Sequence, residues 1–189
     1  IKIYKKKNIE YLPFAFSDKY NIFNKKKVIE KTLFFGSWDK EREAIISEIH
    51  PKFIDIYGNN WTKAGLEFKK KYNINYTELV GNELVKKIQK YLICLNLMRP
   101  QVGNSHNMRL FEILGNGGIL LSKFTEEHNK LLKNQSGCVF YTNASMINKK
   151  IQLIILNKEK FIRLKSKNKK FYKNQSYLSR TKTILDKIK

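Results

Sequence analysis

Several features are scarce in this sequence of 189 residues, and each shortage narrows the class of protein. The two cysteines, Cys94 and Cys138, both have apolar neighbours, which predicts buried free thiols in a reducing cytosol. The longest apolar runs, such as residues 91–95 and 153–156, are too short to cross a bilayer. The lysine-rich start lacks Met and lacks the apolar stretch of a signal peptide. We therefore expect a cytoplasmic protein and a fragment of a longer chain.

Acidic residues and arginines are also scarce. The sequence has 38 basic and 16 acidic residues, a net charge of +22, but only five of the basic residues are arginines. A net charge of this size suggests nucleic acid as a partner. However, Lys, Asn and Ile make up 74 of the residues, and their A/T-rich codons alone could raise the lysine count. A protein that reads nucleic acid would also favour arginine for bidentate contacts, so the composition argues against that class.

The basic residues are concentrated at the two ends of the chain. Residues 149–189 hold 14 basic and two acidic residues, and residues 1–31 hold nine and three. An acidic partner surface would suit these ends, as would an anionic membrane that carries a lipid-linked acceptor. Solvated lysines placed by codon bias are one alternative. A basic nucleic-acid-binding module is the other, because aromatic residues interleave with lysines at residues 169–177.

Short apolar runs alternate with segments of helical periodicity. Strands are expected at residues 31–37, 52–58, 93–98, 117–122 and 138–141. Helices are expected at residues 39–50, 82–91, 108–114 and 126–132 and from residue 143 onward, with Asn82, Asn107 and Thr125 as N-caps. Residues 11–16 predict an extended entry segment because Pro13 disfavours a central strand, and residues 59–76 fit no single pattern.

This alternation predicts an α/β fold, with a Rossmann-like, mostly parallel sheet, helices on both faces and closing helices at the C-terminus. Such sheets bind their ligands at the carboxyl ends of the strands. Four residues, Gly36, Gly58, Arg99 and Gly103, lie at or just past those ends. That edge of the sheet is therefore the expected ligand site.

Arg109 and Glu112 lie on the helix expected at residues 108–114, where they share a narrow polar face that Asn116 continues. A carboxylate near the strand ends suits a pair of ribose hydroxyls, and an arginine beside it suits a diphosphate. Asn107 would add a helix N-terminus, which favours anions. An i,i+3 surface pair with no ligand is the alternative, and the residues alone leave both interpretations open.

Two turns that contain glycine accompany this helix. Gly36 and Ser37 lead into the helix that carries Arg42, so loop amides, a hydroxyl and a guanidinium could converge on a phosphate. A plain helix cap is the alternative role for Ser37. Gly117 and Gly118 form a turn that would let a ligand approach the backbone, or a glycine there simply ends the helix.

Other chemistries find little support in the sequence. The three histidines are scattered without metal-ligand spacing, so no metal site is assigned. No nucleophile elbow or Cys/His pair supports nucleophilic hydrolysis. Glycosidase chemistry needs two acidic residues, and only Glu112 is a convincing one. The sequence therefore assigns no catalytic residue.

The order of these motifs resembles the C-terminal half of a CgeB-like glycosyltransferase, from the spore-maturation-protein group of the two-domain GT-B superfamily. The resemblance covers nearly the whole chain, through YLPFAF, FFGSWDKER, IDIYG, ICLNLM, NMRLFEILGNGGILLS and SYLSRTKTIL. Its most specific part is N-x-R-x-x-E with the glycine turn after it, which comprises Asn107, Arg109, Glu112, Gly117 and Gly118.

The resemblance implies a donor-binding domain that holds a nucleotide-diphosphate sugar without a metal. Glu112 would take the place of a ribose-binding glutamate. The diphosphate and the sugar would face Gly36, Ser37, Arg42 and Arg109.

The resemblance also implies a division of the chain. Residues 1–16 would link to an N-terminal acceptor domain, and residues 17–189 would form the donor domain. Asn104 departs from the pattern, since related retaining enzymes often carry a second glutamate at that position. A degenerate, non-catalytic nucleotide-sugar binder is the alternative to an active enzyme.

Overall fold

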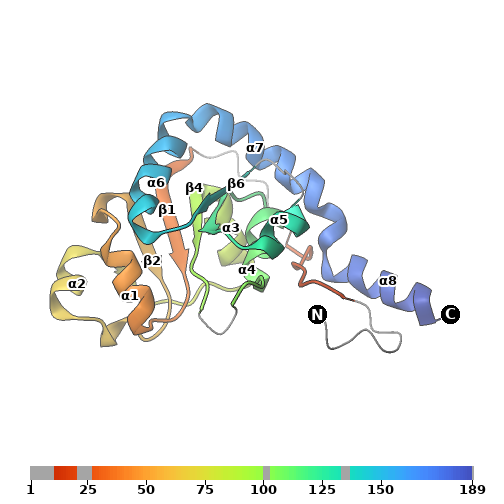
Figure 1. Ribbon diagram of the computed structural model, residues 1–189, viewed down its shortest axis with the longest axis horizontal. Helices are drawn as coiled ribbons and strands as arrows, with labels where there is room; N and C mark the ends of the chain where they lie inside the picture. Colours follow the sequence, from red (N-terminus) through yellow and green to blue (C-terminus); the bar gives the residue numbers. More distant parts are fainter. Residues whose placement is uncertain (1–10, 21–26, 100–102, 133–136, 189) are drawn as a thin grey trace.

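A parallel sheet forms the centre of the fold (Figure 1). The computed structural model describes residues 11–20, 27–99, 103–132 and 137–188. The strands in this part of the chain are β1 (Ile29–Phe35), β2 (Ile54–Tyr57), β3 (Asn73–Asn75), β4 (Tyr91–Asn96), β5 (Leu120–Lys123) and β6 (Cys138–Tyr141). Their order is β3-β2-β1-β4-β5-β6, and every neighbouring pair is parallel. The strand order reverses between β1 and β4, which is where open α/β sheets bind ligands.

Each connection between consecutive strands contains a helix, as parallel strands require. The α-helices are α1 (Lys40–Ser47), α2 (Leu66–Lys71), α3 (Gly81–Lys90), α4 (Met108–Gly115), α5 (Glu126–Leu132), α6 (Ile147–Leu156), α7 (Lys158–Phe171) and α8 (Tyr177–Ile188). Shorter 3₁₀ turns are η2 (Pro51–Phe53), η3 (Trp61–Lys63), η5 (Ala144–Met146) and η6 (Tyr172–Gln175). The expected α/β fold with helices on both faces is confirmed.

The strands are apolar at consecutive positions because both faces of the sheet are covered. On β1, Phe34 belongs to a core that contains buried residues of α1, α2 and α6, whereas Leu33 and Phe35 belong to a core formed with α3, α4 and α5. Ile93 and Cys94 divide in the same way on β4. Cys94 is buried as expected, and burial raises the pKa of its thiol to about 12, whereas Cys138 is only partly buried.

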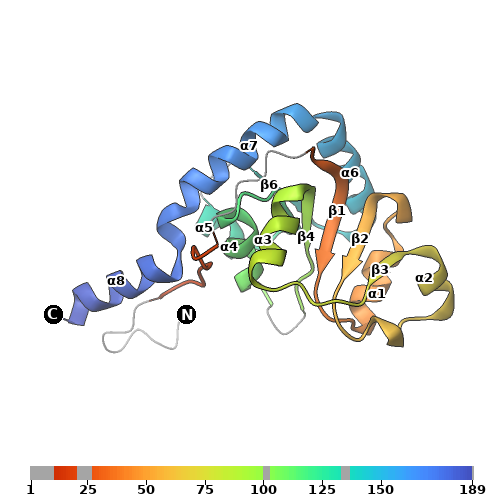
Figure 2. The ribbon, with the colours of Figure 1, turned by 180° about the vertical axis from the view of Figure 1, so that it is seen from behind.

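Helix α7 runs along the edge of the sheet where the strands begin (Figures 1 and 2). Lys165 donates hydrogen bonds to the carbonyls of Ile88 and Tyr91, which accept at the end of α3 and the start of β4. Asn168 donates to the carbonyl of Gly118 at 3.0 Å. Burial lowers the pKa of Lys165 to about 8. Helix α7 is thus hydrogen-bonded to the edge of the sheet opposite the expected ligand site.

Residues 11–16 add no strand to the sheet. Phe16 forms a single parallel bridge with Ser176, just before α8, and its ring packs on α4. A Cβ atom on Gly115, the last residue of α4, would lie 2.3 Å from the Phe16 ring. The entry segment and the start of α8 therefore lie side by side against α4.

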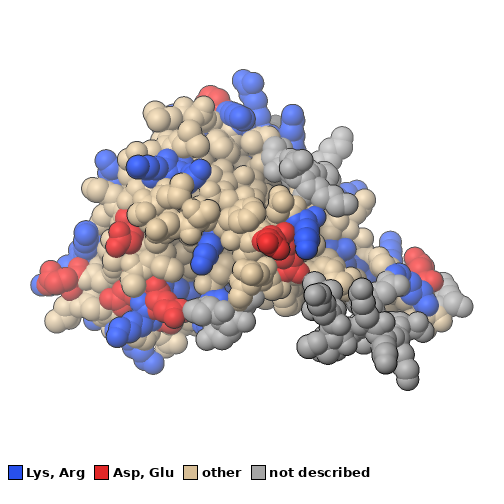
Figure 3. Space-filling model, in the orientation of Figure 1, with Lys and Arg blue, Asp and Glu red and all other residues tan. Residues whose placement is uncertain are grey.

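Helix α8 has no buried residue. Its exposed apolar side chains include Leu178, Ile184, Leu185 and Ile188. No helix in the described part of the chain is long and apolar enough to span a membrane. On the face shown in Figure 3, the basic side chains over α6 and α7 are scattered among uncharged and acidic residues.

Local predictions had mixed outcomes. Thr125 caps α5 as expected, since its hydroxyl accepts a hydrogen bond from the amide of His128 at 3.0 Å. The expected cap at Asn82 is wrong, because α3 begins at Gly81 with Val80 in the cap position. The unassigned residues 59–76 contain η3, α2 and β3.

Candidate functional site

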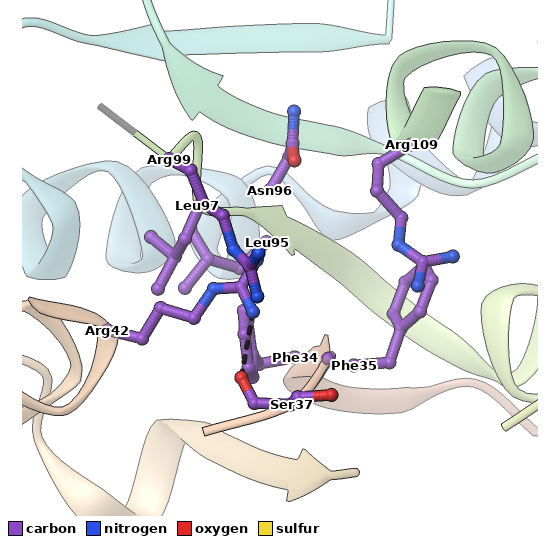
Figure 4. A pocket seen from close by; sticks show the side chains of 10 residues that line it. Phe34, Phe35, Ser37, Arg42, Leu95, Asn96, Leu97, Arg99 and Arg109 are labelled. Carbon is purple, nitrogen blue, oxygen red and sulfur yellow. Dashed lines mark hydrogen bonds between the residues drawn. The ribbon is translucent and has the colours of Figure 1, made fainter. Parts of the chain in front are cut away.

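A cavity of about 180 Å³ lies at the carboxyl ends of β1 and β4, where the strand order reverses. Its lining residues are Phe34, Phe35, Gly36, Ser37, Arg42, Leu95, Asn96, Leu97, Arg99 and Arg109 (Figure 4). It therefore brings together four of the sequence-predicted site residues, Gly36, Ser37, Arg42 and Arg109. Three of the five arginines in the sequence line this one cavity.

Arg42 is fixed beside the turn after β1. Asp39 caps α1 by accepting from the Arg42 amide at 2.9 Å, so Asp39 and not Ser37 is the helix cap. The Arg42 side chain donates from Nη1 to the Ser37 carbonyl at 2.7 Å, and its guanidinium lies 5.7 Å from the Phe34 ring. Burial lowers the pKa of Arg42 and the cations Arg99 and Arg109 add to this, whereas Asp39 opposes it.

The other two arginines approach the cavity from different elements (Figure 4). The guanidinium of Arg109, in the first turn of α4, lies 4.4 Å from the ring centroid of Phe35 and pairs with Glu112. Arg99 follows β4, and its Nε lies 3.8 Å from the Asp39 carboxylate. Its side chain is 55% exposed, so it is the least constrained of the three.

Asn96 and Asn107 join the end of β4 to the start of α4. The Asn107 amide donates to Asn96 Oδ1 at 2.9 Å, and the Asn96 amide donates to Asn107 Oδ1 at 3.2 Å. Asn96 also donates to the Ser122 hydroxyl on β5 at 3.3 Å. Asn107 occupies the cap position of α4 as predicted, but its side chain makes no cap hydrogen bond. Its role is to hold the start of α4 against the strands that form the cavity.

The remaining predicted site residues lie outside the cavity lining. Glu112 lies one turn behind Arg109, and its side chain is 19% exposed. Gly117 has a φ of +79° just after α4, which confirms the helix-ending interpretation. Gly118 is buried, and a Cβ atom there would lie 2.7 Å from the Ile113 side chain. Both glycines come just before β5, at the edge opposite the cavity, so the structure does not bring them to it.

The turn after β1, which lines the cavity, packs closely against Gly58, the residue that follows β2. Gly58 has a φ of +146°, and a Cβ atom on it would lie 2.1 Å from the carbonyl oxygen of Gly36. That carbonyl accepts from Trp61 Nε1 at 2.9 Å, and the Gly36 amide donates to Tyr57. The turn after β1 is therefore held on one side by β2 and on the other by Arg42.

The arrangement is suited to an anion with several oxygens. Three guanidinium groups line the cavity, and the nearby carboxylates, Asp39 and Glu112, already pair with them. Planar guanidinium groups bind phosphate oxygens through paired N–H donors. Within the described ranges, no group of three His, Cys, Asp or Glu side chains could hold a metal ion.

A parallel sheet in this order, with helices on both faces and a cationic cavity where the order reverses, defines a Rossmann-like α/β domain. The family model described as glycosyl transferase-like matches residues 22–186, so the chain belongs to that family. No curated protein sequence matches the chain.

Solved structures share the fold at low sequence identity. The catalytic domain of cholesterol-alpha-glucosyltransferase from Helicobacter pylori is 14% identical, with a TM-score of 0.57, and the match covers 77% of this chain and 99% of that one. TarM is 12% identical with a TM-score of 0.59, and the match covers 90% and 37% of the two chains. A T4 phage BGT mutant in complex with UDP-glucose is 14% identical with a TM-score of 0.59, covering 84% and 48%. The chain thus spans about half or less of the last two. Together these matches confirm the GT-B fold.

The sequence motifs assign no ligand contact to two polar residues that line the cavity, Asn96 and Arg99. Both lie at the end of the β4 strand, and that position was the available signal. The sequence places Arg99 at the ligand edge without assigning it a contact, and Asn96 lies within an apolar run. Gly103 also lies past β4, but nothing would lie within 4 Å of a Cβ atom there.

Proposed function

We propose that this chain is the donor-binding domain of a glycosyltransferase and that the cavity holds the diphosphate of a nucleotide sugar. The convergence of Arg42, Arg99 and Arg109 on one cavity carries the proposal. A diphosphate offers enough oxygens to engage all three guanidinium groups. Gly36 and Ser37 add a turn whose backbone a phosphate can approach closely. These five residues would bind the charged part of the donor.

Glu112 would accept hydrogen bonds from the ribose hydroxyls. One of its oxygens pairs with Arg109, and a carboxylate has further acceptor capacity for hydroxyl donors. The pair would then link the ribose to the diphosphate, because Arg109 also lines the cavity. Asn107 would contribute indirectly by holding the start of α4.

The related structures support a uridine nucleotide as the first donor to test. Two T4 phage BGT structures contain UDP-glucose in one case and UDP with Mn²⁺ in the other. The N-x-R-x-x-E motif on α4 supports membership of the CgeB-like group. We propose that the donor binds without a metal, since the arginines supply the positive charge that the diphosphate requires.

The whole protein would transfer the sugar to an acceptor held by a further domain. In this proposal residues 1–16 are the linker to that domain, and residues 17–189 form the donor domain. The enzyme would work in the cytoplasm, and an anionic membrane surface would be a partner if the acceptor is lipid-linked.

Isothermal titration calorimetry with UDP, UDP-glucose and uridine tests the proposal. We expect UDP and UDP-glucose to bind more tightly than uridine, because only they carry the diphosphate. Equal affinities for UDP and uridine would refute the role of the cavity. A parallel titration with oligonucleotides at two salt concentrations separates the alternative class. Nucleic-acid binding without UDP binding would overturn the proposal, and loss of that binding at high salt would identify it as nonspecific.

A further inference from the structure

Glu127, in the first turn of α5, collects three hydrogen bonds from two other segments. Its Oε1 accepts from the Tyr11 hydroxyl at 2.6 Å. Its Oε2 accepts from the Ser105 hydroxyl at 2.6 Å and from His106 Nδ1 at 3.0 Å. Burial alone would raise the pKa of Glu127, but these hydrogen bonds lower it to about 2. The carboxylate is therefore a charged, fixed acceptor between the entry segment and the loop before α4.

His106 connects the same two segments a second time. The Phe14 amide donates to Nε2 at 3.1 Å, so Nε2 has no proton and Nδ1 donates to Glu127. The imidazole is only 5% exposed, and its centroid lies 5.4 Å from the Phe14 ring and 5.7 Å from the Phe111 ring on α4. The Glu127 carboxylate therefore selects the tautomer that lets His106 hold the entry segment.

These contacts fix α4 at both ends. The residue after His106 is Asn107, whose amide is paired with Asn96 at the end of β4. Phe16 packs at the other end of α4, where Gly115 leaves room for its ring. Residues 11–16 thus follow α4 along its length, and Arg109 projects from the first turn of this helix.

We infer that Glu127 is a positioning residue for the donor site, because through Ser105 and His106 it fixes the start of α4 from which Arg109 reaches the cavity. The inference rests on the proposed function, since the diphosphate is the ligand that Arg109 would contact. Glu127 does not line the cavity, so it would act through α4 and not on the donor. The competing explanation is that Glu127 only fastens residues 11–16 and has no effect on the cavity.

Glu127→Gln is the test variant, because an amide keeps the shape of the side chain but presents a donor where the carboxylate has only acceptors. Glu126→Gln is the matched control, since Glu126 is the exposed neighbour in the same turn. Tyr11→Phe is a milder variant that removes a single hydroxyl. We expect Glu127→Gln to bind UDP about 3- to 30-fold more weakly in calorimetry, the range typical of coupling through a packed network. Glu126→Gln should match the wild type.

A double-mutant cycle with Arg109→Lys identifies the route of the effect. If Glu127 acts through Arg109, Glu127→Gln should cost clearly less UDP affinity when Arg109 is already replaced. Additive losses would contradict the inference, and so would unchanged UDP affinity in both Glu127→Gln and Tyr11→Phe. Nitrogen-15 NMR of His106 should show the Nδ1-protonated tautomer in the wild type and a changed pattern in Glu127→Gln. If the wild type binds no UDP, the proposed function and the positioning role are both wrong. If the wild type and Glu127→Gln bind UDP equally tightly, only the positioning role is refuted.

Discussion

Arg42→Lys is the substitution that tests the cavity most directly. Lysine keeps the positive charge but loses the planar fork of the guanidinium. In the structure Arg42 Nη1 donates to the Ser37 carbonyl, and Nε forms an ion pair with Asp39 at 3.3 Å. An ammonium group can replace one of these contacts and cannot also present a second, parallel N–H to a phosphate.

The expected loss follows from the hydrogen bonds that disappear. A hydrogen bond to a charged group contributes about 1.5–3 kcal/mol, so the loss of one at the diphosphate should weaken UDP binding about 10- to 100-fold. Uridine has no phosphate, and its affinity should change by less than about two-fold on the same scale. The freed Ser37 carbonyl adds a separate cost of about 1 kcal/mol to folding stability.

Calorimetry with UDP and uridine measures the first effect, and urea unfolding measures the second. Arg163→Lys is the matched control, because Arg163 is exposed on α7 at the opposite edge of the sheet. The reasoning is refuted if Arg42→Lys lowers the UDP and uridine affinities equally, since that would make Arg42 a structural residue. An identical loss in Arg163→Lys would show that the effect is not specific to the cavity.

Four further predictions concern other residues. Glu112→Ala should weaken UDP binding about 10- to 100-fold with an unchanged circular dichroism spectrum, and full affinity in calorimetry would exclude the ribose role. Gly58→Ala should lower the free energy of unfolding by more than about 2 kcal/mol, because its Cβ would meet a carbonyl oxygen at 2.1 Å, and an unchanged urea midpoint would contradict this. The pKa of Lys165 is about 8 in the folded state, below its value in the unfolded chain, so the folded state loses this proton first as the pH rises. The stability of the wild type relative to Lys165→Met should therefore increase between pH 8 and 10.5. Urea midpoints of both proteins at about pH 7.5 and 9.5 would measure this increase. We also propose that α8 docks on anionic membranes through its exposed apolar side chains and its lysines. In liposome co-sedimentation at low salt, anionic vesicles should retain more protein than neutral vesicles do. Equal retention by the two kinds of vesicle would refute this docking.

The sequence predicted the elements whose signals are local. Residues 33–35 of β1 are apolar in succession because both faces of that strand are covered, and this pattern is visible without a structure. Strand β3 gives no such signal, since it is the short edge sequence Asn73-Ile74-Asn75, and Asn73 is used to donate to Asp55 at 2.9 Å. Its strand conformation depends on the neighbouring β2, so the sequence pattern could not reveal it.

The candidate site likewise contains residues with local sequence signals and residues that only the folded structure brings together. Gly36, Ser37 and Arg42 could be grouped from the sequence, because one short turn places them together. Arg99 reaches the cavity only through the pairing of β4 with β1. The constraint on Gly118 comes partly from Ile113, five residues earlier, and partly from Ile88, which lies far away in the sequence. Contacts of that kind depend on the assembled fold and leave no local pattern.

The bridge between Phe16 and Ser176 has a mechanical consequence. The entry segment and the residues just before α8 lie side by side and share this bridge. Two parallel connections resist torsion about their common direction more than one connection does. A further domain joined through both segments, as in the proposed function, would therefore hinge about one axis and would not rotate freely. That bending would strain the hydrogen bonds of Tyr11 and Phe14, which end at Glu127 on α5 and at His106 just before α4. Movement of such a body would then reach the start of α4, the helix that carries Arg109.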